Sequence, residues 1–546
     1  MTIGSRQTSI VRALNNRIRA RQSTDRGAPV SSPIKHTQSY LEAADRAYAA
    51  GDWQSALQLA DKAIAANPRN SDALHRRGLI ALAMGSPAEA QIWLRRAVQL
   101  FPHPVYCNSL CVTQTRLGDY AAAAETARLG LRRARERFPA VDTSLLSYNL
   151  GVALQLDDQP EAAAQSYRQT LARQPDHTAA HNNLGTVTKD LGDLVTAIGH
   201  FERAIALDPR NVEAHSNLGH ALLAAGHYEE AWPYFEQRWA SFQAGDRPAA
   251  QGAPMLPIPP WRSGPLPGER RLLVLHEQGF GDALQFCRYL PVALAHGTRV
   301  GYVCPKPLRR LFEQSLCTRW PNIELLDEVP SDLGEWDAHC SLLSLPMLLG
   351  TRLDTIPALV PYLHAESQRA HRWADRLRAV GNDVKPRIGV VWAGGHTGTA
   401  ADRRRSIAPD TFAKLLSWQG AHWISLQKAE DASKQLPPAY RAQVTDWMDE
   451  VGDFADTAAL IDGLDLVISV DTSVAHLAAA MGKPVWLLNR FAGCWRWLRD
   501  RDDSPWYSGL RLFTQKERNN WDDVLNCVLD TLATRYPVNE TAISQA

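Results

Sequence analysis

Small and hydrophobic positions recur with a fixed period in the first half of the chain. Between residues 39 and 242 the spacing of these positions is 34 residues. Gly51, Ala56, Ala63 and Pro68 are repeated as Gly85, Ala90, Ala97 and Pro102, and a second series is formed by Gly151, Gly185 and Gly219. Small residues let paired helices approach closely, and a proline closes each unit. The pattern therefore predicts about six helix pairs.

A 34-residue period of this kind is typical of tetratricopeptide repeats. Such repeats stack into an α superhelix whose first helices line a concave groove. Four asparagines fall on predicted first helices: Asn149, Asn182, Asn183 and Asn217. They either bind the backbone of an extended acceptor peptide or are solvated positions on the helices. The third unit is irregular, because residues 128–139 form a longer, basic stretch.

From residue 271 the pattern changes to short apolar runs separated by helical segments. These runs cover residues 272–275, 299–304, 387–392, 423–426, 466–470 and 485–488. Alternation of buried strands and helices predicts a doubly wound α/β domain, long enough for two lobes with a break near Asp383. Ligands of such sheets bind at the carboxyl ends of the strands.

These patterns predict five segments: a basic tail (1–36), the repeat array (37–242), a proline-rich linker (243–268) and two lobes (269–382 and 383–538). The tail has seven basic residues and one acid. It is interpreted as disordered, with a partner- or membrane-binding helix as the alternative. The linker has seven prolines, and Trp261 near its end is expected to pack on the next domain.

Composition excludes several classes of protein. Lys and Arg number 59 and Asp and Glu 58, so the net charge of +1 gives no general attraction to nucleic acid. No run of about 18 apolar residues indicates a membrane span, and no secretory signal is seen. Eight scattered cysteines fit reduced thiols better than a zinc site or a disulfide framework. We therefore expect a cytoplasmic protein.

Three clusters follow predicted strands. The first, at residues 276–285, has two glycines that allow close backbone approach and Asp282 at a helix start, where it could also be a simple cap. In the second, a glycine-rich turn at residues 393–398 precedes three arginines at 403–405, which form either an anion site or a solvated loop. In the third, Thr472 and Ser473 begin a helix whose free N–H groups suit a phosphate, with His476 one turn later.

Residues 279–282 and 471–478 resemble the corresponding segments of heptosyltransferase-like glycosyltransferases of the GT-B fold. Together with the repeat array, the layout is similar to that of bacterial relatives of protein O-linked N-acetylglucosamine transferase and of bacterial flagellin glycosyltransferases. The resemblance implies inverting transfer of a sugar from a nucleotide-sugar donor to a Ser or Thr hydroxyl of a protein acceptor. The nucleotide sugar would be a co-substrate, and no other cofactor is expected.

The resemblance also implies roles for individual residues. Asp282 would be the general base. The expected donor- and phosphate-binding residues are Gly281, Arg403, Arg405, Gln427, Lys428, Asp471, Thr472, Ser473 and His476. The choice of the two arginines, Gln427 and Lys428 depends mainly on their position after strands. No Asp-x-Asp follows a strand, so no metal is expected, and a helix terminus with Arg or Lys can stabilise the leaving phosphate.

Two alternatives remain open. The chain could be a non-catalytic tetratricopeptide scaffold with a degenerate transferase domain. It could also be a glycan-assembly transferase acting on a lipid-linked or polysaccharide acceptor, although residues 276–278 lack the apolar-basic lead-in of lipopolysaccharide heptosyltransferases. A segment rich in Trp and Arg (495–507) has either a role in substrate binding or a role in packing between the lobes.

Overall fold

A computed structural model describes residues 32–238, 256–262, 270–297, 299–380, 385–395, 404–428 and 435–537. The chain divides into two compact units, and the boundary between them falls inside helix α12, after Asn217. Most of the predicted tail and linker, and the predicted break between the lobes, lie outside the described residues.

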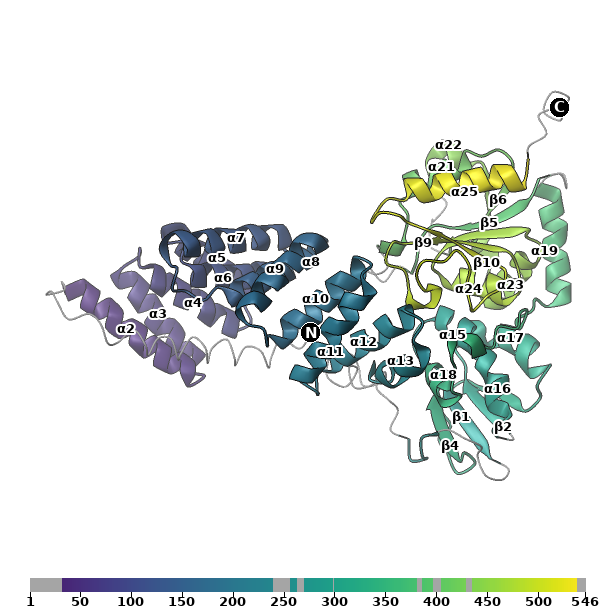
Figure 1. The fold of residues 1–546 in the computed structure, drawn as a ribbon, viewed down its shortest axis with the longest axis horizontal. Coiled ribbons are helices and arrows are strands. Elements are labelled where there is room, and N and C mark those ends of the chain that lie inside the picture. Colours follow the sequence, from purple (N-terminus) through teal and green to yellow (C-terminus); the bar gives the residue numbers. More distant parts are fainter. Residues whose placement is uncertain are drawn as a thin grey trace. The chain divides into compact units, whose positions relative to one another are not determined.

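The first unit is an array of helix pairs (Figure 1). Its helices are α2 (Ser32–Ala49), α3 (Trp53–Ala66), α4 (Ser71–Ala83), α5 (Pro87–Leu100), α6 (Pro104–Arg116), α7 (Tyr120–Arg137), α8 (Ser144–Leu156), α9 (Pro160–Arg173), α10 (Thr178–Asp190), α11 (Leu194–Leu207) and the first part of α12 (Val212–Ala224). The predicted tetratricopeptide superhelix is therefore confirmed, and α13 (Tyr228–Phe235) completes a sixth pair.

The recurring glycines are explained by packing within each pair. A methyl group on Gly151 of α8 would lie 2.6 Å from Cε1 of Tyr167 on α9, and one on Gly185 of α10 would lie 2.7 Å from Cε1 of Phe201 on α11. Only glycine leaves room for these rings. The irregular third unit corresponds to α7, which has 18 residues, whereas α5 and α9 have 14.

The second unit begins with the end of α12 and with α13, and continues into a lobe built on a four-stranded parallel sheet. Its strands are β1 (Arg271–Leu275), β2 (Arg299–Val303), β3 (Ile323–Leu326) and β4 (Ala338–Ser341), in the order β3-β2-β1-β4. The helices include α15 (Phe280–Phe286), α16 (Leu290–Leu294), α17 (Lys306–Phe312) and α18 (Leu345–Leu348). Helix α19 (Ser367–Val380) follows in the sequence but packs on the second lobe (Figure 1). Trp261 is buried near His296, as expected.

The second lobe is built on a six-stranded parallel sheet in the order β10-β9-β8-β5-β6-β7. Its strands are β5 (Arg387–Val391), β6 (His422–Ser425), β7 (Val444–Asp446), β8 (Leu466–Val470), β9 (Val485–Asn489) and β10 (Leu510–Thr514). Its helices are α21 (Pro409–Leu416), α22 (Pro438–Arg441), α23 (Phe454–Asp462), α24 (Ser473–Ala480) and α25 (Asp522–Arg535). The predicted α/β architecture is confirmed, but β3, β4, β7 and β10 were not predicted.

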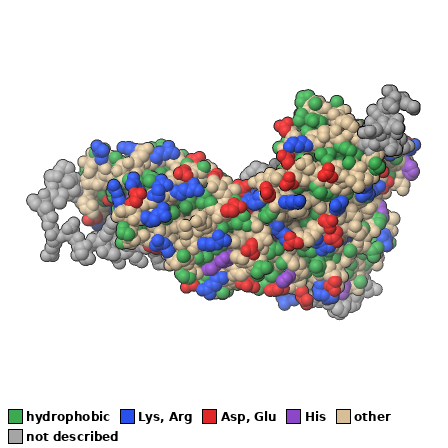
Figure 2. Space-filling model, turned by 45° about the horizontal axis from the view of Figure 1, so that its top comes forward, with side chains coloured by type: hydrophobic (Ala, Val, Ile, Leu, Met, Phe, Trp, Pro, Cys, Tyr) green, Lys and Arg blue, Asp and Glu red, His purple; other side chains and the backbone are tan. Residues whose placement is uncertain are grey.

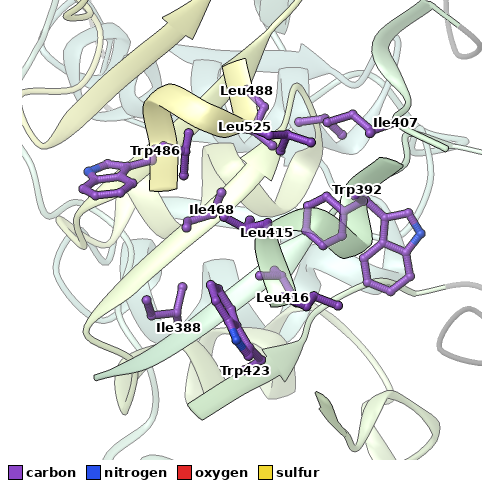
Figure 3. Close-up of a cluster of buried hydrophobic side chains, with 14 of the residues drawn as sticks. Ile388, Trp392, Ile407, Leu415, Leu416, Trp423, Ile468, Trp486, Leu488 and Leu525 are labelled. Atoms are coloured by element: carbon purple, nitrogen blue, oxygen red, sulfur yellow. The ribbon is translucent and has the colours of Figure 1, made fainter. Parts of the chain in front are cut away.

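A hydrophobic core fixes one face of this second sheet. Side chains of β5, β6, β8 and β9 pack against α21 and α25, as Figure 3 shows for Ile388, Trp423, Ile468, Leu415 and Leu525. Four of these five are fully buried and Trp423 is nearly so. A rigid sheet of this kind holds the carboxyl ends of its strands in fixed positions, which is what a binding site built on the following loops requires.

Candidate functional site

Asp282 lies in the first turn of α15, immediately beyond the loop that follows β1. The backbone N–H of Gly279, the residue that precedes α15, donates a hydrogen bond to Oδ2 of Asp282 over 3.0 Å. The capping interpretation of this aspartate is thus correct for one of its oxygens. The other oxygen, Oδ1, faces Arg496 of the second lobe.

Thr472 and Ser473 begin α24 directly after the fully buried strand β8. The Thr472 hydroxyl lies 2.9 Å from the Ser469 hydroxyl and makes no capping bond to the helix. The N–H groups of the first turn are therefore not capped by this side chain, which leaves them suited to an anion.

The starts of α15 and α24 meet at Gly281. A methyl group at Gly281 would lie 3.1 Å from Cδ2 of His476 and 3.7 Å from the backbone N of Ser473. The loops after β1 and β8, which belong to different sheets, thus bring Asp282 and the hydroxyl-bearing helix start into one region. Glycine is needed here because a side chain would press on the imidazole.

Arg496 joins the two lobes at this point. Its Nη2 forms an ion pair with Oδ1 of Asp282, and its Nε donates to Oε1 of Gln285 over 2.5 Å. The guanidinium also lies 4.6 Å from the centre of the Trp495 ring. The side chains of Asp282 and Arg496 are only 20% and 10% exposed, so the pair is largely removed from water. The sequence analysis did not identify Arg496, although its place between two tryptophans was a usable signal.

His476 is buried behind the start of α24. Its Nδ1 lies 2.9 Å from the Tyr507 hydroxyl, and its ring stacks on Trp497 at 5.2 Å between centroids. Its Nε2 is 3.9 Å from Oδ1 of Asp471. Burial, with the positive charge of Arg496 as the next cause, lowers the pKa of His476 well below its usual value. The imidazole is therefore neutral near pH 7 and can act as a hydrogen-bonding group.

Arg405 reaches the same region from the loop after β5. Its Nη1 donates to the backbone O of Asp471 over 3.0 Å. A side chain at Gly394 would collide with the Arg405 guanidinium, so this glycine makes room for it. Arg403, the other predicted arginine, lies outside the described residues.

Gln427 and Lys428 follow β6, but their side chains are bound within the second lobe. Oε1 of Gln427 accepts hydrogen bonds from the backbone N–H groups of Trp392 and Ala393, over 3.2 and 2.9 Å. Nζ of Lys428 donates to the backbone oxygens of Met448 and Val451, over 2.7 and 2.6 Å. In this structure both residues brace loops at the carboxyl edge of the sheet.

The lobes are also held together by arginines of the first lobe. Arg288 is buried; its Nη1 donates to the backbone O of Trp506 over 2.7 Å and its Nη2 to the Tyr362 hydroxyl over 2.8 Å. Arg310 pairs with Asp453 and Asp456 of α23, over 2.5 and 2.9 Å. Trp495 and Trp506 are buried and pack on Phe286 of the first lobe, so these two side chains of the segment lie between the lobes.

Comparisons with known proteins find matching families for segments in both parts of the chain. Tetratricopeptide repeats match residues 41–103, 148–194 and 187–226. Glycosyltransferase family 9 (heptosyltransferase) matches residues 451–488, which contain α23, β8 and α24. The chain is a tetratricopeptide array fused to a glycosyltransferase-like domain. The predicted combination is confirmed, and the matched segment includes Asp471 and His476 but not Asp282.

Individual proteins are also similar to this chain. Protein FlbA of Caulobacter vibrioides is 25% identical over 513 residues, which cover 88% of this chain and 82% of FlbA. Among solved structures, PilW, titled a widely conserved type IV pilus biogenesis factor, is 20% identical and covers 38% of this chain and 95% of its own, with a TM-score of 0.34. PilF of Pseudomonas aeruginosa is 13% identical, and the match covers 39% of this chain and 96% of PilF, with a TM-score of 0.35.

The four predicted groove asparagines form bonds between neighbouring helices of the array. Asn149 Nδ2 donates to Asn108 Oδ1 over 2.8 Å, and Asn217 Nδ2 donates to Asn182 Oδ1 over 3.0 Å. Asn183 is buried, and its amide donates to the Tyr148 hydroxyl over 3.2 Å and to the Tyr167 hydroxyl over 3.3 Å. Asn149 and Asn217 are the more accessible of the four.

Other features of the glycosyltransferase-like domain lie away from this site. A cavity of about 320 Å³ is lined by Trp486, Leu510, Arg511 and neighbours at the amino ends of β9 and β10, the edge opposite to Asp471. Among the described residues, no cluster of His, Cys, Asp and Glu is arranged to hold a metal ion. Within that same set, no helix has the length and apolar character of a membrane span.

Proposed function

We propose that this chain transfers a sugar from a nucleotide-sugar donor to a Ser or Thr hydroxyl of a protein acceptor bound by the repeat array. The observation that carries the proposal is the meeting of Asp282 and the start of α24 around Gly281. A carboxylate that can take a proton and a helix start that can hold a diphosphate are the two groups that such a transfer needs.

In the proposed reaction, the acceptor oxygen forms a bond to the anomeric carbon as the bond from that carbon to the donor phosphate breaks. Asp282 accepts the hydroxyl proton, and the nucleoside diphosphate leaves with the bonding electron pair. The N–H groups at Thr472 and Ser473 stabilise the charge that develops on the leaving group. Direct displacement of this kind inverts the anomeric centre.

Asp282 keeps the capacity to act as a base while it is bound to Arg496. An ionised carboxylate offers about four lone-pair sites. Arg496 and the Gly279 N–H occupy one on each oxygen, so each oxygen retains one for the acceptor hydroxyl. Arg496 would thus orient the base and limit its contact with water.

The remaining predicted donor residues fall into two groups. Arg405, Asp471 and His476 surround the start of α24, which favours direct roles in binding the diphosphate or the sugar. Gln427 and Lys428 are engaged with backbone groups, so we propose that they shape the loops on which the donor rests. Arg403 is proposed as a further cation for the diphosphate on its sequence position alone.

The repeat array would bind the protein acceptor. Asn149 and Asn217 are proposed to exchange their hydrogen bonds to other asparagine amides of the array for bonds to an extended peptide backbone. A flagellar protein is one acceptor class suggested by the resemblance to flagellin glycosyltransferases, and such an acceptor would be modified in the cytoplasm.

Two measurements test the proposal. In a panel of nucleotides and nucleotide sugars, the true donor should raise the thermal midpoint, since a ligand at 100 times its Kd adds about 2.7 kcal/mol. A non-catalytic scaffold would respond to none of them. Intact-protein mass spectrometry of cells with and without this chain should then show a protein that loses the mass of one or more sugars. If the loss appears only on lipid-linked or polysaccharide glycans, the protein acceptor is wrong.

A further inference from the structure

A buried ion pair connects the end of the repeat helices to the loop that carries Asp282. Arg238, three residues beyond α13, donates from Nε to Oε2 of Glu277 over 3.0 Å and from Nη2 to Oε1 over 2.7 Å. The side chains are 4% and 7% exposed. A two-pronged arginine–carboxylate pair is directional as well as strong, so it fixes orientation as well as distance.

The rest of the Arg238 guanidinium is also fully engaged. Its Nη1 donates to the backbone O of Phe235 over 3.2 Å and to Oε1 of Glu236 over 2.5 Å, and its Nη2 donates to the Ser344 hydroxyl over 3.0 Å. The Phe235 ring lies 4.5 Å below the guanidinium. Arg238 is thus held by the end of α13 itself and presents only one edge to Glu277.

Helix α13 is in turn fixed on the transferase domain. The indole N–H of Trp232 donates to the backbone O of Thr351 over 2.8 Å, and the Tyr228 hydroxyl accepts from the indole of Trp506 over 3.2 Å. This helix belongs to the second compact unit, although its sequence completes the last tetratricopeptide pair.

Glu277 transmits this constraint to the site. Its Oε1 also accepts from the hydroxyl of Ser341, the last residue of β4, and from the N–H of Leu343 over 3.2 Å. Gln278, the next residue, has a φ of 64°, a left-handed conformation in which the chain turns sharply. Gly279 then begins α15 and bonds to Asp282. Four residues separate the fixed Glu277 from Asp282.

We propose that Arg238 is a positioning residue for the loop of residues 276–282, so that the last helix of the array is a working part of the transferase. The expected effect of Arg238 on catalysis rests on the function proposed above, whereas its effect on the conformation of the loop does not. Through the pair of Arg238 with Glu277, the end of α13 is joined directly to the loop that carries the proposed base. A truncation that removes α13 together with the array should therefore impair the site itself.

The test compares Arg238→Gln with Arg77→Gln in the full chain. Arg77 is a matched control because it is another buried arginine held by two carboxylates, Asp61 at 2.9 Å and Glu89 at 2.6 Å, but it lies in α4 of the array. Hydrogen exchange of residues 276–286 is measured at a temperature where both variants are folded. We expect faster exchange there in Arg238→Gln and wild-type exchange in Arg77→Gln.

Kinetics supply the second readout. With the donor found in the panel, Arg238→Gln should lower kcat for donor hydrolysis in water by about tenfold or more, because small displacements of a catalytic group are costly. The KM for the donor should change by less than about twofold, since the donor groups belong to the second lobe. Arg238→Lys, which keeps the charge but not the two-pronged geometry, should fall between wild type and Arg238→Gln.

The outcomes separate the two proposals. Unchanged exchange over residues 276–286 in Arg238→Gln, or equal acceleration in Arg77→Gln, overturns the positioning role. A wild-type chain that hydrolyses no nucleotide sugar defeats the proposed function instead, and the exchange comparison still decides the role of Arg238. Should Arg238→Gln fail to fold, the same exchange measurement on Arg238→Lys decides it.

Discussion

The carboxylate of Asp282 and the guanidinium of Arg496 form an ion pair that bridges the two lobes of the glycosyltransferase-like domain, across 214 residues of sequence. One partner lies in the first turn of α15 and the other in the Trp-Arg-Trp turn after β9. Each is held by a second bond, from Gly279 to Asp282 and from Arg496 to Gln285. The relative position of the lobes at the proposed site therefore depends on this pair.

Replacing Arg496 should destabilise the second unit and misplace the base. Arg496→Gln leaves Asp282 largely buried without its cation, and we expect a loss of about 3 kcal/mol in unfolding free energy. Asp282→Asn in the same chain should recover part of this loss. Urea denaturation of the two single variants and the double variant measures the coupling, and strictly additive losses would show that the ion pair has no energetic role.

His476 should make the second unit less stable in mild acid. Its folded-state pKa is lowered, so protonation favours the unfolded chain, and stability is lost as the pH falls through the unfolded value of about 6.5. Between pH 7.5 and 5.5 this single group accounts for about 1.4 kcal/mol. Chemical denaturation at both pH values should show that His476→Gln reduces the pH dependence by about this amount. An unchanged pH dependence would mean that the pKa of His476 is the same in the folded and the unfolded protein.

Gly281 should tolerate no side chain. Even the methyl group of Gly281→Ala would lie 3.1 Å from the His476 ring, and Gly281→Val should cost about 1–3 kcal/mol of stability through overpacking. Gly199→Ala is the control, because a methyl group there meets nothing within 4 Å and alanine favours the helix. Thermal unfolding of these variants tests the close approach of α15 and α24. A fully stable Gly281→Val would show that the two helix starts can separate freely.

The groove asparagines should affect acceptor binding and not donor chemistry. Loss of one hydrogen bond from Asn217→Ala should raise KM for a polypeptide acceptor by about two- to tenfold, while donor hydrolysis in water stays at the wild-type rate. Asn183→Ala is the contrast, since the Asn183 amide is buried and donates to the hydroxyls of Tyr148 and Tyr167, so that its loss should lower stability first. Steady-state kinetics with acceptor varied separates the two. Equal acceptor KM values for wild type and Asn217→Ala would remove Asn217 from the groove.

Helix pairs and buried strands could be predicted, because each depends on residues that lie close together in the sequence. The 34-residue spacing indicates helix pairs because each pair needs a glycine at the same place: Gly151 packs against the ring of Tyr167, and Gly185 against that of Phe201. The apolar runs indicate parallel strands, and the polar residues after them mark the carboxyl edge of each sheet, as Asp282 does after β1 and Ser473 after β8. That these two edges face each other depends on how the lobes pack, which no strand pattern specifies.

Contacts between distant loops could not be predicted in this way. Arg496 and Arg238 find their carboxylates over 214 and 39 residues, and no local pattern specifies either pair. The same limit applies to Gln427 and Lys428: their place after β6 was visible, but their bonds to backbone groups of other loops depend on how those loops fold. Strands β3, β4, β7 and β10 were also missed, and the first three have only three or four residues, too few to show a pattern.

The central claim is that Asp282 removes the acceptor proton during sugar transfer. The most direct measurement is nucleoside diphosphate release by wild type and Asp282→Asn, with the donor identified by thermal stabilisation and its binding followed by calorimetry. We expect release by the wild type, a decrease of about 10²–10⁴-fold in the variant, and donor affinity close to that of the wild type. Release at the wild-type rate by folded Asp282→Asn would contradict the account.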